Sequence, residues 1–163
     1  MEVLQTRTVR QENELTALVR QLDGNLIQAF GLSADQLDTD LFGRFAQWMR
    51  LCYQQKVAGL SEFTDSLTSQ GRERQKNFLH YALRFIRECL MLPYADQTLS
   101  RLTPEEKDFA RNFAPFIHRA NGVLFTDELN RALFHIERNA NPSLLFMDLS
   151  LTFCKLLKMK PDR

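Results

Sequence analysis

The feature that most constrains this chain is a mostly polar segment at residues 136–142 (IERNANP), followed at once by the apolar segment 144–151 (LLFMDLSL). Asn141 suits a helix cap, and Pro142 suits the first helical turn because the N–H that proline lacks has no partner there. Only two residues between positions 143 and 157 are charged. Leaving a leucine or phenylalanine in water forfeits about 1.5–3 kcal/mol, so this helix needs cover on more than one flank. It is either the central helix of a bundle or a helix at an interface between subunits.

The length of 163 residues suits one domain, or one domain plus a fragment, and a composition of 44% hydrophobic and 25% charged residues is ordinary for a soluble globular protein. The 21 Lys and Arg residues nearly balance 20 Asp and Glu residues, which argues against a wholly basic nucleic-acid binder. We expect no membrane span, because no apolar run reaches the roughly 18 residues required, and no signal peptide, because the N-terminus is too polar. Cys52, Cys89 and Cys154 lie among apolar neighbours, which predicts buried, reduced thiols in a cytoplasmic protein.

Helical spacing of apolar residues along almost the whole chain predicts an all-α fold, a bundle of about six to eight helices. Residues 15–22 mark a first helix. Asp40 is expected to cap a long helix. Ser61 is expected to cap a shorter helix, which Gly71 ends. The helix after that is expected to stop at Pro93.

Start and stop signals also mark the second half of the chain. Residues 103–106 (TPEE) form a capping box, and Pro115 is expected to kink or split the helix that follows. Either Thr126 or Asp127 is expected to cap the helix that leads into the polar segment 136–142. The Asn-Gly pair at 121–122 resembles a hairpin turn, but no alternating segments flank it, so we expect no strand pairing there.

No residue pattern typical of catalysis or cofactor binding occurs in the sequence. His80, His118 and His135 belong to no metal-binding motif and are expected to be structural or surface residues. Phosphate-binding glycine loops and nucleophile motifs are also missing. The sequence therefore predicts that the chain is not an enzyme and has no cofactor, no metal site and no catalytic residue.

The densest basic segment is 71–77 (GRERQKN). In one interpretation, Arg72, Arg74 and Lys76 contact a phosphate at a helix N-terminus. In the other, they lie on a solvated first helical turn, and the negative charge of Glu73 weakens their positive electrostatic field. We favour the second, because a phosphate footprint normally needs several unopposed cations.

Residues 136–143 (IERNANPS) with 146–150 (FMDLS) resemble the closing signature of the delta-prime subunits of the bacterial DNA polymerase III clamp loader, in their Bacteroidetes form. The segments 71–79 (GRERQKNFL), 87–89 (REC) and 48–50 (WMR) strengthen the resemblance.

The resemblance covers the chain from Asp40 to its end and implies a division into domains. Residues 40–163 would be the helical collar domain, and 33–39 a linker. Residues 1–32 would be a helical remnant that resembles the end of the AAA+ lid domain. Family members carry an ATPase module before these parts, and its absence from this sequence means that neither ATP hydrolysis nor an arginine finger carries over. What carries over is the collar's role of holding the gamma/tau and delta subunits together in DNA replication, with weak or indirect DNA contact.

Two roles are open for Arg138, Asn139 and Asn141. They either tie the helix junction together internally or contact a neighbouring subunit at the same place. The internal role is favoured because an asparagine before proline at a helix start already has a local function. On the apolar helix itself, the candidate interface residues are Leu145, Leu149 and Phe153.

Two other functions fit the residues. One is a free-standing helical adaptor that binds a peptide or helix in an apolar groove, without loader subunits. The other is a DNA-binding module that uses segment 71–77, whose affinity for duplex DNA falls steeply with salt. A bundle enzyme would require a polar pocket of converging acids or histidines, which the sequence does not indicate.

Overall fold

The computed structural model describes residues 40–94 and 102–161, and these residues are all-α without any strand. The prediction of a helical bundle is therefore confirmed. Six α-helices and a short 3₁₀ helix form it: α3 (Leu41–Gln54), α4 (Val57–Thr68), α5 (Arg72–Met91), α6 (Pro104–Phe113), η2 (Ala114–Phe116), α7 (Arg119–Glu137) and α8 (Pro142–Leu156).

The chain divides into two compact units between Asp38 and Thr39, and the described helices belong to the second. The predicted helix at 15–22, the predicted remnant at 1–32 and the predicted linker at 33–39 lie outside the described residues.

Two helix starts and one helix end differ from the sequence prediction. The structure starts α4 at Val57, so Ser61 lies inside this helix and does not cap it. The same helix ends at Thr68, and Gly71 instead precedes α5, with φ of 87°. The predicted start of α7 was also wrong, since this helix begins at Arg119 and contains residues 126 and 127.

Side-chain hydrogen bonds explain the missed start of α7. The Oδ1 atom of Asn121 accepts a hydrogen bond from the backbone N–H of His118 at 2.8 Å, so the cap is supplied from inside the helix. The hydroxyl of Thr126 donates to the carbonyl of Gly122 at 3.0 Å, which satisfies it within the helix. The Asn-Gly pair at 121–122 is buried in α7, in agreement with the expectation that no hairpin forms there.

The other local signals are confirmed. Asp40 caps α3 by accepting from the N–H of Gly43 at 3.1 Å. The capping box forms at the start of α6, and Pro115 lies in η2, which separates α6 from α7. The helix α5 ends at Met91, two residues before Pro93. Each of these features depends on residues close in sequence, which is why the sequence alone indicates them.

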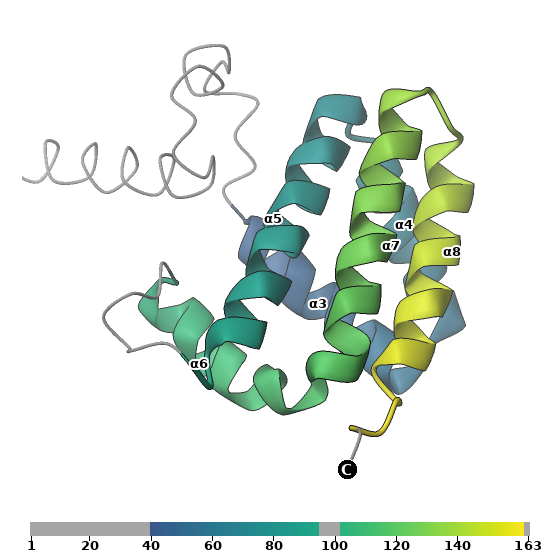
Figure 1. Cartoon of the computed structure of the whole chain (residues 1–163). Helices are drawn as coiled ribbons and strands as arrows, with labels where there is room; N and C mark the ends of the chain where they lie inside the picture. The colour runs from purple at the N-terminus through teal and green to yellow at the C-terminus, as the bar shows by residue number, and fades with distance from the viewer. Residues whose placement is uncertain (1–39, 95–101, 162–163) are drawn as a thin grey trace, which may run out of the picture. The chain divides into compact units, whose positions relative to one another are not determined.

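Buried apolar side chains of all six α-helices, whose arrangement Figure 1 shows, form one core. The helix α8 packs against α3, α4 and α7, and α7 packs against α5. At the centre, the indole of Trp48 lies 4.9 Å from the ring of Phe153, centroid to centroid, and donates a hydrogen bond to the hydroxyl of Ser150 at 2.8 Å. The expectation that α8 is covered on more than one flank is therefore confirmed.

The three cysteines are buried and free, as expected from their apolar neighbours. Among residues 40–94 and 102–161, no helix is both long and apolar enough to cross a membrane.

Candidate functional site

The two segments that the sequence singled out lie at the same end of the bundle. There α5 begins, α7 ends and α8 begins, as the upper ends of these helices show in Figure 1. The hydroxyl of Ser143 donates to that of Thr68 at 3.5 Å, which joins the start of α8 to the end of α4. We call this the junction end and define it by residues 71–76 and 138–143.

The polar segment 136–142 makes hydrogen bonds and a cation–ring contact within the chain. The guanidinium of Arg138 lies 3.4 Å from the centroid of the Phe134 ring and donates to the carbonyl of the same residue at 3.2 Å. Asn139 has φ of 64°, a left-handed conformation that asparagine tolerates better than most residues. The Oδ1 atom of Asn141 accepts from the N–H groups of Ser143 and Leu144. These contacts close the turn between α7 and α8.

Replacing Asn141 with alanine is expected to lower the free energy of unfolding by about 1 kcal/mol, the usual cost of losing a helix cap. The midpoint of urea denaturation, followed by circular dichroism, measures this change. The control is Asn130→Ala, an exposed position inside α7 where alanine favours the helix and no loss is expected. Equal midpoints for Asn141→Ala and the wild type would show that this cap is not needed.

The three candidate residues on α8 differ in accessibility. Leu149 and Phe153 are fully buried in the core, and Leu145 is half-buried. In the folded chain, therefore, a neighbour does not reach Leu149 or Phe153. The exposed leucines of this helix are Leu144, with 72% of its surface accessible, and Leu151, with 42%. Sequence periodicity did not identify this outward side because apolar residues surround the helix.

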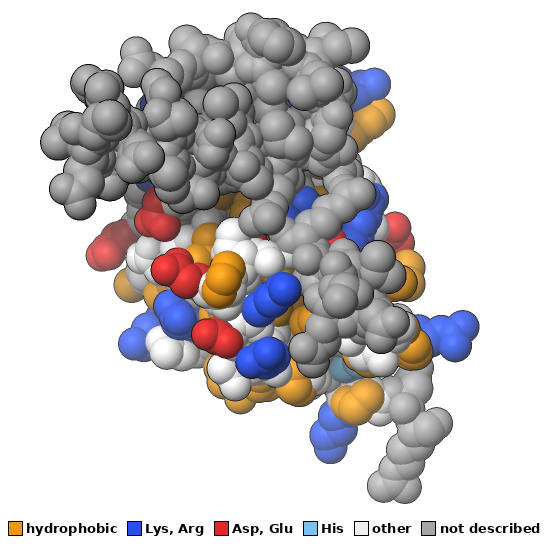
Figure 2. Space-filling model, turned by 90° about the vertical axis from the view of Figure 1, so that its left-hand side faces the viewer, with side chains coloured by type: hydrophobic (Ala, Val, Ile, Leu, Met, Phe, Trp, Pro, Cys, Tyr) orange, Lys and Arg blue, Asp and Glu red, His pale blue; other side chains and the backbone are white. Residues whose placement is uncertain are grey.

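The basic segment offers few unopposed cations. Arg72 is exposed, Arg74 is half-buried, and the ammonium of Lys76 is paired with the carboxylate of Glu73 at 2.7 Å. Figure 2 shows one face of the bundle, on which acidic and basic side chains are interspersed. Since phosphate binding depends on several unopposed cations, this arrangement favours the solvated first turn.

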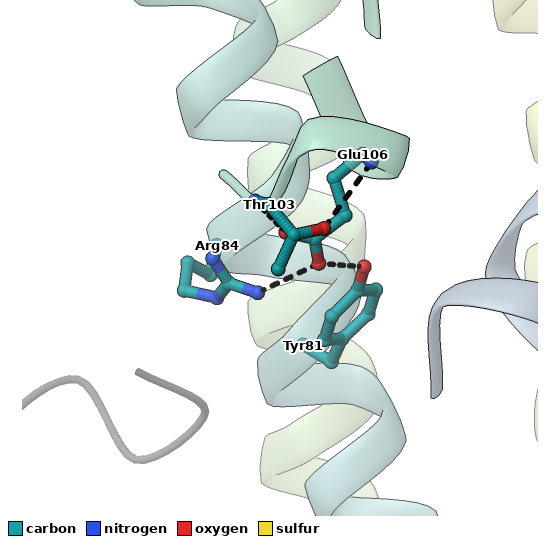
Figure 3. A network of polar contacts seen from close by, with 4 residues as sticks. All are labelled: Tyr81, Arg84, Thr103 and Glu106. Atoms are coloured by element: carbon teal, nitrogen blue, oxygen red, sulfur yellow. Dashed lines mark hydrogen bonds and ion pairs between the residues drawn. The ribbon is translucent and has the colours of Figure 1, made fainter. Parts of the chain in front are cut away.

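A buried carboxylate that the sequence did not connect to its partners joins α5 to α6 (Figure 3). The Oε1 atom of Glu106 accepts from the hydroxyl of Tyr81 at 2.6 Å and from the guanidinium of Arg84 at 3.4 Å. Its Oε2 atom accepts from the N–H of Thr103 at 2.8 Å, which is the capping-box bond. All these donors belong to the chain itself, so the cluster holds the first turn of α6 against α5. The capping box is visible in the sequence, whereas its contact with α5 is not.

Burial of cysteine thiols and of a tyrosine hydroxyl predicts that the fold loses stability at alkaline pH. Burial raises the pKa of the Cys89 thiol to about 12, and it raises the pKa of the Cys52 thiol and of the Tyr81 hydroxyl, the latter also through the charge of Glu106. In the unfolded chain these groups ionise near pH 8.5 to 10. Above that range the folded chain binds more protons than the unfolded chain, so the free energy of unfolding falls as pH rises.

The expected loss reaches about 1.4 kcal/mol per pH unit for each group that is ionised only in the unfolded chain. Urea midpoints at about pH 7.5, 9 and 10.5 measure it, and Cys89→Ala, which removes one of the groups, is expected to make the decline shallower. A midpoint that does not change up to about pH 10.5 would contradict the prediction.

A pocket of about 210 Å³ opens at the other end of α3 from Asp40. It lies beside α6, η2 and the end of α8. Most of its lining is apolar, from Met49, Tyr53, Phe109, Phe113, Phe116 and Leu157. Sequence reasoning did not identify this pocket, because its walls come from segments far apart in the chain.

The histidines form no joint site. His80 and His135 are exposed, and the Nε2 atom of His118 lies 3.1 Å from the carbonyl oxygen of Met159. In the part of the chain that the structure describes, no three His, Cys, Asp or Glu side chains are grouped so as to hold a metal ion.

Comparisons of this chain with protein-family models, with curated proteins and with solved structures give no match.

Proposed function

We propose that this chain is a non-catalytic oligomerisation domain of the clamp-loader delta-prime type, which holds loader subunits together while a sliding clamp is placed on DNA. The proposal starts from the resemblance of residues 40–163 to the collar domain of that family. The observation that carries it is the outward face of α8, where Leu144 and Leu151 are exposed on a helix otherwise enclosed by its own bundle.

The outward face of α8, which we define as Leu144, Asp148, Leu151 and Lys155, has the spacing of a helix-packing seam. Successive members are four, three and four positions apart, so they lie along one side of the helix. The two leucines alternate with two charged residues, and the carboxylate of Asp148 pairs with Arg131 of α7 at 3.1 Å. Apolar contacts beside polar groups are the usual composition of a protein interface.

The proposed partners are the gamma/tau and delta subunits, whose own collar domains would pack against this face. Burying a leucine that is now mostly exposed stabilises a complex by up to about 1.5–3 kcal/mol, before the cost of association. The role proposed for this chain is to hold subunits in place, and it includes no step of nucleotide hydrolysis.

Light scattering coupled to size-exclusion chromatography tests the proposal. The full chain is run alone and mixed with the C-terminal domains of gamma/tau and delta from the same cells. A defined complex that forms only in the mixture is the expected result. A chain that keeps its own mass in every mixture, at concentrations well above those in cells, would refute the collar role.

A free-standing adaptor is the second candidate, and the pocket beside α3 favours it. An adaptor of this kind would bind a peptide with or without loader subunits. The mixing experiment separates the two functions, because only the collar role requires a complex with gamma/tau and delta.

A further inference from the structure

The pocket beside α3 combines apolar walls with two nearby cations: Arg50 belongs to its lining, and Lys158 contacts the lining residue Tyr53. The guanidinium carbon of Arg50 lies 5.6 Å from the centroid of the Phe109 ring. The ammonium of Lys158 lies 4.3 Å from the centroid of the Tyr53 ring. A cation above the face of an aromatic ring is attracted to it, so both side chains are held near the walls of the pocket.

Neither cation has a carboxylate within ion-pair distance among residues 40–94 and 102–161. The ion pairs of the described residues join other side chains: Glu73 with Lys76, Arg84 with Glu106, Asp108 with Arg111, and Arg131 with Glu128 and Asp148. The positive charges of Arg50 and Lys158, beside an apolar pocket, are therefore not neutralised by a carboxylate of the described residues. A ligand with a carboxylate next to an apolar group complements this arrangement.

We propose that this pocket binds a short acidic and hydrophobic peptide segment of a partner protein. A bulky apolar side chain of the segment enters the pocket, and carboxylates beside it contact Arg50 and Lys158. The volume of about 210 Å³ suits a single large side chain and is smaller than the roughly 300–1,000 Å³ of typical small-molecule sites. Interfaces commonly concentrate their affinity in such an anchored side chain.

The inference goes beyond the oligomerisation role, and it deepens the adaptor function considered above by naming that function's site and the chemistry of its ligand. None of the four residues of the outward face of α8 lines the pocket. A chain held in a collar would therefore still present the pocket to a further protein, and loss of one interaction does not predict loss of the other.

Selection from a phage-displayed library of random linear peptides against the full chain tests the inference. The expected result is enrichment of sequences in which an aromatic or large aliphatic residue has Asp or Glu beside it. The enriched peptides are then synthesised with a fluorescent label, and their affinities are measured by anisotropy at low and high salt. We expect the affinity to fall as salt rises, because exposed charges are screened.

Two variants of the chain test the two parts of the pocket. Arg50→Glu with Lys158→Glu reverses the rim charges and is expected to weaken binding by about tenfold or more. Asn112→Trp fills the pocket from an exposed lining position and is expected to weaken binding without changing charge. The matched control, Arg72→Glu with Arg87→Glu, makes the same change in net charge at exposed positions outside the pocket and is expected to bind normally.

Three results would overturn the inference. The first is a library that yields no enriched sequence, or enriches basic or uncharged ones. The second is binding that the pocket variants leave unchanged while circular dichroism shows them folded. The third is a concentration-dependent dimer that Arg50→Glu with Lys158→Glu abolishes, which would identify a second copy of this chain as the occupant.

Discussion

Replacing Leu149 with aspartate is expected to leave the chain unfolded. Leu149 lies on the inner side of α8 with only 1% of its surface accessible. The substitution removes a packed side chain, at a cost of about 2–5 kcal/mol. It also places a carboxylate without a partner in the core, which costs several kcal/mol more. The sum is comparable to the 5–15 kcal/mol by which domains are usually stable.

Far-ultraviolet circular dichroism and elution volume measure this outcome. The control is Leu151→Asp, on the same helix but on its outward face, which is expected to remain folded and to lose less than about 1 kcal/mol. A Leu149→Asp chain with wild-type helix content and elution volume would mean that the inner side of α8 is not buried as described.

Replacing Asn121 with leucine is expected to have the second largest effect, although the two side chains are similar in size. Asn121 is fully buried at the start of α7. Its amide donates to the carbonyls of Phe116 and Leu156, at 2.9 and 3.0 Å, and its oxygen accepts from the N–H of His118. Leucine leaves the His118 N–H and the Phe116 carbonyl without this partner, whereas the Leu156 carbonyl keeps the N–H of Met159 at 3.1 Å. Each unsatisfied buried group costs about 1–3 kcal/mol, so we expect a loss of about 3–5 kcal/mol.

The free energy of unfolding in urea measures this loss, with Asn130→Leu as the control. Asn130 is exposed on the same helix, where a surface substitution changes stability by less than about 0.5 kcal/mol. If both variants unfolded at the same urea concentration, the hydrogen bonds of Asn121 would not hold the ends of η2 and α8 to α7.

The sequence predicted those features of the fold that depend on neighbouring residues. Asp40, the capping box at 103–106 and Asn141 each satisfy backbone groups within three positions, and their helices start where expected. The start of α4 follows Lys56, which makes no side-chain cap, so the nearest serine was a misleading signal. The cap at the start of α7 comes from Asn121, the third residue of this helix. No Ser, Thr or Asp directly precedes the helix, so its start is not marked in the sequence.

The candidate sites were less accessible to sequence reasoning because they depend on contacts between distant segments. The apolar character of α8 was clear, but its periodicity did not separate the buried Leu149 from the exposed Leu151. The contact of Tyr81 with Glu106 spans 25 positions, and only the folded chain brings the two together. The prediction that Arg138 and Asn141 act at the helix junction followed from local chemistry, and in the structure both residues make hydrogen bonds to backbone groups within four positions.

The most direct test of the oligomerisation role is the mass in solution of Leu144→Asp with Leu151→Asp, mixed with the C-terminal domains of gamma/tau and delta. Both positions are exposed, so the fold should survive, as circular dichroism will check. Val57→Asp with Met91→Asp, at exposed apolar positions on α4 and α5, makes the same charge change and serves as the control. We expect the wild type and the control to form the complex and the α8 variant to elute with the mass of the free chain. A folded α8 variant that assembles like the wild type would contradict the proposed interface.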